Sequence, residues 1–188
     1  MQVRGKASFP VVPPPNIQHV KISFDTMAIA LLTGTLMGIV GIVITVYMGF
    51  SIDGRLGVSD HFMFALFATM VVTLSHSMAI FYFIGTGKQV KDLLESHPQA
   101  GEFIQRTRVF KSQTSPSATM AILFTMAAWI IGGGVDTRVV PTWIHTVLAL
   151  LALITNVVAF VREAKCMAEN NILLDEVAVL VGETPQGE

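Results

Sequence analysis

Three polar residues stand out because they lie inside long uncharged stretches: His76, His145 and Asn156. A histidine imidazole is a common axial ligand of haem iron, and it also suits copper. Polar groups inside apolar segments are rare and usually face the interior of a helix bundle. The sequence therefore predicts a haem b or a chlorophyll-type pigment ligated by His76, with His145 as the second choice.

The two histidines allow either one shared site or two separate sites. His76 lies 12 residues before Lys88, whereas His145 lies 17 residues before Arg162. This mismatch of five residues is about 7 Å of helix, which is awkward for a single bis-histidine haem but does not forbid it. His61 and His145 could form a second pair near the outer surface. The predicted cofactor site contains His76, His145, Asn156 and Thr73, and the predicted metal ligands are His76, His145 and His61.

The same residues also have an interpretation that needs no cofactor. His76 would then donate a hydrogen bond to Asn156 or to a backbone carbonyl and hold the helices together. His145 would be an interfacial histidine beside Trp143, in the aromatic belt of a membrane protein. Ten methionines suggest copper as a third ligand class, but the chain has no tight Met-x-Met or His-x-His cluster. Methionine more often fills gaps in a core.

Four stretches without charge must position these residues. None of the 12 Lys and Arg or 13 Asp and Glu falls in the windows 26–52, 61–87, 112–135 and 139–161. Each window exceeds the roughly 20 apolar residues that a helix needs to cross a bilayer. The composition agrees, with 52% hydrophobic and 13% charged residues. The sequence therefore predicts four transmembrane helices.

Positive charge is distributed very unevenly between the two sides of these helices. Ten of the 12 Lys and Arg lie in the N-terminal arm, in the segment 88–111 or after residue 161. Only Arg55 and Arg138 lie in the other two connections. Basic loops stay on the cytoplasmic side. We therefore expect an integral protein of a cytoplasmic-type inner membrane with both termini in the cytoplasm.

The expected fold is an all-α, antiparallel four-helix transmembrane bundle whose last three helices extend into the cytoplasm. Four prolines predict an extended arm at residues 1–22. The bundle is expected over 23–165, followed by a cytoplasmic helix end and tail over 166–188. Turn residues and prolines set the expected helices at about 24–50, 61–96, 103–134 and 141–181.

Small residues at intervals of three and four mark one stripe on each helix, as expected for helices that pack closely in lipid. The four stripes are Ala30, Gly34, Gly38, Gly41 and Thr45; Ala65, Thr69, Thr73, His76 and Ala79; Ala118, Ala121, Thr125, Ala128 and Gly132; and His145, Ala149, Ala152, Asn156, Ala159 and Glu163. Each stripe is expected to face the bundle interior.

Several function classes are excluded or disfavoured. With a net charge of −1, the chain lacks the excess of basic residues that is typical of nucleic-acid-binding proteins. The charge-free windows hold no acidic or basic residue, which disfavours ion-coupled transport. The sequence contains no catalytic triad and no paired-carboxylate motif. We therefore expect the protein to have no catalytic activity of its own.

The expected topology, with its two histidines, is similar to that of the small four-helix b-type cytochrome anchors of respiratory complexes. That resemblance implies a haem-binding subunit of an electron-transfer complex. The alternative function is that of a cofactor-free accessory or assembly subunit. A weaker alternative is a copper-handling membrane protein. The expected partners are the lipid bilayer and either other membrane subunits or further copies of the chain.

Overall fold

Four long helices make up nearly all of the part of the chain that the structure describes. The computed structural model describes residues 17–52, 57–95 and 97–183. Over these residues the chain forms α1 (Ile17–Phe50), α2 (Val58–Leu93), α3 (Ala100–Asp136) and α4 (Thr142–Glu183), with no strand. All four helices are long and apolar enough to cross a membrane. The predicted all-helical class and the number of apolar helices are therefore confirmed.

The helix ends differ from the expected ones by a few residues, except at the start of the chain. Helix α1 begins at Ile17, inside the segment 1–22 that was expected to be an extended arm. Because the prolines all precede Asn16, nothing in residues 17–22 opposes a helix. The arm prediction is thus wrong for 17–22, while residues 1–16 lie outside the described part of the chain.

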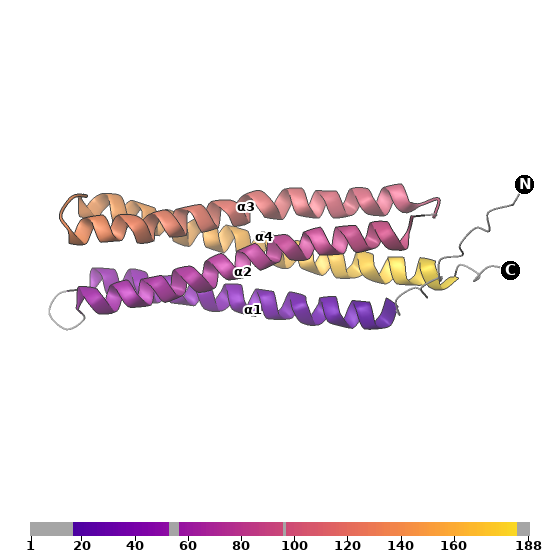
Figure 1. The fold of residues 1–188 in the computed structure, drawn as a ribbon, viewed down its shortest axis with the longest axis horizontal. Helices are drawn as coiled ribbons and strands as arrows, with labels where there is room; N and C mark the ends of the chain where they lie inside the picture. Colours follow the sequence, from indigo (N-terminus) through magenta and orange to yellow (C-terminus); the bar gives the residue numbers. More distant parts are fainter. Residues whose placement is uncertain (1–16, 53–56, 96, 184–188) are drawn as a thin grey trace, which may run out of the picture.

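The helices lie side by side along a common long axis, and the chain reverses direction at each connection (Figure 1). Each helix packs against the next one in sequence, and α4 returns to pack against α1. The diagonal pair α2 and α4 has far fewer contacts, as expected for opposite corners of a four-helix arrangement. Side chains that reach across this diagonal therefore occupy the centre of the protein.

Glycines bring α1 and α2 into close contact. A Cβ atom added at Gly34 would lie 2.8 Å from Ser75 Oγ, and one added at Gly38 would lie 2.6 Å from Val72 Cγ2. An added Cβ would force the Ser75 hydroxyl to rotate at Gly34 and the stiffer, β-branched Val72 side chain to move at Gly38, where the α2 backbone is also close, so the absence of a side chain at Gly38 allows the observed helix separation. The expected stripe is thus present at these positions, although Ala30 at its start is exposed.

The stripes on α3 and α4 also face inward. Ala118, Ala121, Thr125 and Ala128 of α3 are buried, as are Ala152, Asn156, Ala159 and Glu163 of α4. Large side chains such as Leu123 and Ile154 point outward, each more than half exposed. The interior that α3 and α4 contribute over the charge-free windows is therefore built mainly from small residues.

The other end of the helices has a different kind of core. Large buried side chains gather where α2 ends, α3 begins and α4 ends: Tyr82, Phe83, Leu94, Phe103, Phe110, Met167 and Leu173. Tyr82 makes edge contacts with Phe24 and Phe83, with ring centroids 5.8 and 5.2 Å apart. Bulky apolar packing of this kind is typical of cores that form in water, where the hydrophobic effect drives burial.

Candidate functional site

His76 lies at the centre of the protein, and both nitrogens of its ring face oxygens of α4. The side chain is fully buried. Its Nδ1 lies 2.8 Å from Glu163 Oε1, and its Nε2 lies 3.0 Å from Asn156 Oδ1. These two contacts cross the diagonal between α2 and α4, which explains how helices with few mutual contacts are held together.

The other contacts of Asn156 identify the direction of its bond to His76. Asn156 Nδ2 donates to Thr125 Oγ1 at 2.8 Å and to the Ala152 carbonyl at 2.7 Å. Its Oδ1 is therefore the atom that faces the ring, and an amide oxygen only accepts hydrogen bonds. His76 Nε2 must carry a proton and donate it. Because Thr125 lies on α3, the network joins three of the four helices.

Glu163 closes the other side of the ring. With Nε2 protonated, the contact between Nδ1 and Oε1 holds one further proton, which belongs to either the imidazolium or the carboxyl group. The second oxygen, Oε2, is buried and has no hydrogen-bond partner among the described residues. A buried pair of this kind strongly disfavours loss of either partner, because the remaining group would stay in the interior unpaired.

These contacts bear directly on whether His76 can bind a metal. An axial ligand needs a ring nitrogen with a free lone pair that points at the iron. In this structure Nε2 donates to Asn156 and Nδ1 is bound to Glu163. Ligation would require breaking a buried hydrogen bond, so the observed arrangement does not fit a haem or pigment ligand. Thr73, also expected at the site, takes no part, and its Oγ1 has no partner among the described residues.

A second polar layer lies further along α4. Asn170 Nδ2 donates to the Tyr82 hydroxyl oxygen at 3.1 Å, and the Tyr82 hydroxyl lies 3.3 Å from Asn171 Oδ1. Asn156, Glu163 and Asn170 follow one another at intervals of seven residues, which places them on one face of the helix. All three are fully buried. The centre of the protein therefore contains a polar seam that runs along α4.

His61 and His145 form a separate pair near the opposite end of the helices. Their ring centroids are 6.2 Å apart and the rings are nearly perpendicular. His145 Nδ1 lies 3.0 Å from the Ala128 carbonyl, which leaves its Nε2 as the nitrogen with a lone pair. Glycine makes room for each ring, since a Cβ at Gly49 or Gly132 would lie 3.2 or 3.1 Å from the nearest ring carbon.

The structure separates His76 from His145. His145 lies level with His61, and 15 residues of α2 separate His61 from His76, which is about 22 Å of helix. A single site shared by His76 and His145 is therefore not formed. The pairing of His61 with His145 that the sequence suggested is present as a contact. Among the described residues, no cluster of three or more His, Cys, Asp or Glu could hold a metal ion.

Glu163 is the residue that the sequence interpretation left out of the site. It follows Arg162, which ends the charge-free window, so the sequence places it on the α4 stripe but outside the expected membrane span. In the structure Arg162 is exposed while Glu163 is fully buried, because successive helical residues point about 100° apart. The seven-residue spacing from Asn156 was the available signal. The interior of the protein thus contains an acidic side chain, although the charge-free windows do not.

No family model matches the chain, and no curated protein and no solved structure matches it. The function is therefore inferred from the geometry alone.

Proposed function

We propose that the protein is a membrane-spanning subunit with a cofactor-free interior, which acts as an accessory or assembly subunit of a larger membrane complex. The observation that carries this proposal is the double engagement of His76 by Glu163 and Asn156. A histidine whose two nitrogens are both bound to protein oxygens supports a structural role over ligation. This favours the second of the three functions expected from the sequence, the accessory or assembly subunit.

Two further features support the insertion of the helices into a membrane. Large apolar side chains are exposed on all four helices, for example Leu36, Phe67, Leu123 and Ile154, each at least 50% exposed. In water such surfaces would aggregate, whereas lipid or neighbouring membrane subunits would cover them. The small-residue interior beneath them is the packing that lipid favours.

The contrast between the two halves of the interior supports extension of the helices beyond the membrane. The part of the bulky core around Leu94, Phe103 and Leu173 lies outside the charge-free windows, on the side that holds most of the basic residues. There Arg106 also pairs with Glu176 through both of its terminal guanidinium nitrogens. Together with the charge asymmetry between connections, this supports a cytoplasmic location for that half and for both termini.

An absorption spectrum of the full chain, purified in mild detergent, tests the cofactor-free interior. We expect no Soret band and no change in the visible spectrum of His76→Ala. The matched control is His97→Ala, because that histidine lies in the connection after α2. A Soret band that His76→Ala removes and His97→Ala retains would overturn the proposal and restore the haem-binding function.

The subunit role needs a separate measurement. The assembly extracted from the native membrane should be larger than the isolated chain in its detergent micelle, with a fixed ratio of this chain to other subunits. Light scattering coupled to size exclusion measures that size. A chain that is extracted only as a monomer would contradict the role of accessory subunit while leaving the cofactor-free interior intact.

A second candidate function is the binding of a copper or zinc ion by His61 and His145. The observation in favour is that His145 Nδ1 contacts a backbone carbonyl, which is how metal-binding histidines are commonly oriented. His61 Nδ1 is buried and has no hydrogen-bond partner among the described residues. Calorimetric titration with copper or zinc should then show binding that His61→Ala and His145→Ala both abolish. Equal binding by the variants would exclude this site.

A further inference from the structure

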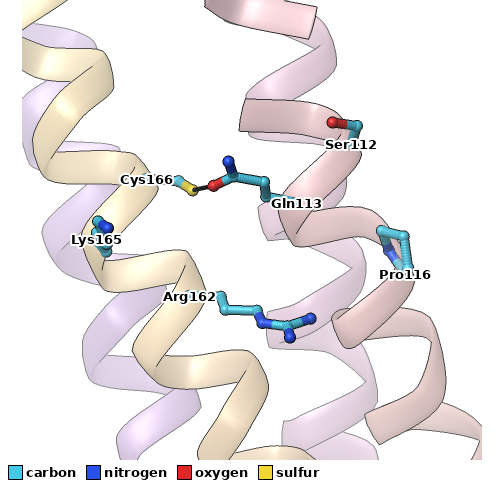
Figure 2. A pocket seen from close by; sticks show the side chains of 6 residues that line it. All are labelled: Ser112, Gln113, Pro116, Arg162, Lys165 and Cys166. Atoms are coloured by element: carbon cyan, nitrogen blue, oxygen red, sulfur yellow. Dashed lines mark hydrogen bonds between the residues drawn. The ribbon is translucent and has the colours of Figure 1, made fainter. Parts of the chain in front are cut away.

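A pocket of about 420 Å³ lies between α3 and α4. This volume falls in the range of about 300–1,000 Å³ that small-molecule sites occupy. Figure 2 shows the two helices facing each other, with Arg162 extending from α4 toward α3. The residues that line the pocket are Ser112, Gln113, Pro116, Arg162, Lys165 and Cys166.

The pocket carries positive charge that nearby acidic groups hardly neutralise. Arg162 and Lys165 line it, and none of its lining residues is acidic. Arg162 has no ion-pair partner among the described residues, whereas Arg106 elsewhere on α3 is paired with Glu176. Lys165 approaches Glu169 only to 3.9 Å, with side chains that are 73% and 45% exposed, so this pair is weak. The pocket therefore attracts an anion.

The α3 wall of the pocket can add a hydrogen-bond donor. Gln113 Oε1 accepts a hydrogen bond from the Cys166 thiol at 3.4 Å, as the dashed line in Figure 2 marks. That contact fixes the orientation of the amide group and leaves its NH₂ group, with two donors, for another acceptor. One guanidinium, one ammonium and one amide around a single cavity form a donor set that suits phosphate oxygens.

The position of the pocket along the helices indicates where such a phosphate would come from. From Thr142 to Arg162, α4 rises about 30 Å, which matches the thickness of the hydrocarbon core. Ser112 marks the corresponding end of the charge-free window in α3. In a membrane-inserted chain the pocket would therefore lie at the level of the lipid headgroups.

Apolar side chains continue from the pocket toward the middle of the charge-free windows. Val158 lies four residues before Arg162, and Met120 and Leu123 lie four and seven residues after Pro116, on the same faces of their helices. All three are more than 40% exposed. An acyl chain attached to a headgroup in the pocket would lie against them.

We propose that this pocket binds the phosphate group of an anionic lipid headgroup on the cytoplasmic side of the membrane. The inference rests on the proposed membrane insertion of the chain. Basic pockets between transmembrane helices on that side are suited to anionic headgroups. Arg162 and Lys165 bind the phosphate oxygens, Gln113 donates to them, and the apolar residues of α3 and α4 contact the acyl chains.

Lipid titration of the purified full chain in dodecyl maltoside tests this site. The probes are phosphatidylglycerol, phosphatidylcholine and inorganic phosphate, and native mass spectrometry counts bound molecules. We expect saturable binding of phosphatidylglycerol. Arg162→Gln with Lys165→Gln should weaken it roughly thirty-fold, since each cation near an anionic surface contributes about 1 kcal/mol. Arg162→Lys, which keeps the charge, should retain most of the binding.

The charge-matched control is Lys88→Gln with Lys91→Gln, because these two cations lie on α2 outside the pocket. An equal loss in this control would mean unspecific attraction to the basic surface and would overturn the proposal. Equal binding of phosphatidylcholine, or inorganic phosphate bound as tightly as the lipid, would overturn the lipid assignment. A chain that alkaline carbonate extracts from membranes would contradict the proposed function itself, which separates the two failures.

Discussion

Removal of the Glu163 side chain should destabilise the protein more than removal of any exposed acidic group. When the shared proton lies on the imidazole, so that both groups are charged, the attraction between unit charges on Nδ1 and Oε1 at 2.8 Å and an effective dielectric constant of about 20 is about 6 kcal/mol. Desolvation of the two groups offsets most of this gain, so the intact pair contributes little net stability. Loss of one partner is different, because the desolvated partner remains. We therefore expect Glu163→Ala to cost about 3–5 kcal/mol.

Glu163→Gln separates the charge from the hydrogen bond. Its amide group can still bond to His76 Nδ1, so the cost should be only about 1 kcal/mol. The combination of His76→Ala with Glu163→Ala completes a double-mutant cycle. Once the histidine is absent, Glu163→Ala removes an unpaired buried carboxyl group, and we expect a coupling energy of about 2–3 kcal/mol.

Reversible unfolding of the purified chain in mixed micelles with increasing dodecyl sulfate, followed by circular dichroism, measures these free energies. The matched control is Glu169→Ala, six residues further along α4, where the side chain is 45% exposed. It should change the free energy of unfolding by less than about 0.5 kcal/mol. A coupling energy below about 0.5 kcal/mol between His76 and Glu163 would refute the reasoning, because the two side chains would then act independently.

Three further perturbations test the packing, a turn and the topology. Gly38→Leu should lower the free energy of unfolding by about 1–3 kcal/mol in the same assay, whereas Gly85→Leu, where an added Cβ has no neighbour within 4 Å, should be nearly neutral. Arg138→Gly should raise the free energy of unfolding by about 1 kcal/mol, because Arg138 has a φ of 59°, which glycine adopts without strain. An unchanged free energy of unfolding would contradict this expectation. In a Cys166→Ser background, an impermeant maleimide added outside intact cells should label Arg138→Cys but not Lys91→Cys, and the opposite labelling would reverse the proposed orientation.

The small-residue stripes of α1, α3 and α4 were largely predictable because they follow from helix geometry. The buried face of α2 is offset from its predicted stripe, because Ala68, Val72 and Ser75 are buried, whereas Ala65, Thr69 and Thr73 are only partly buried. The spacing of three and four residues identified Gly34, Gly38 and Gly41, and the structure places all three against α2. The predicted stripe on α4 contained Asn156 and Glu163, so the sequence predicted which face of α4 points inward. The sequence could not show that Glu163 belongs beside His76. Helix geometry fixes the relative positions of residues on one helix. Only packing fixes how two helices are aligned along their axes.

The alignment of α2 and α4 along their axes also decides which residues His76 and His145 contact. The sequence alone determined four charge-free stretches, each long enough for a membrane helix, and it located every polar residue in them. It left open whether His76 and His145 meet. The tertiary structure placed His76 between Glu163 and Asn156, and His145 beside His61, because the packing of the helices sets how they align along the common axis. The physical reason is that a ring nitrogen bonds to whichever oxygen lies within about 3 Å, and that distance depends on the packing of helices far apart in sequence.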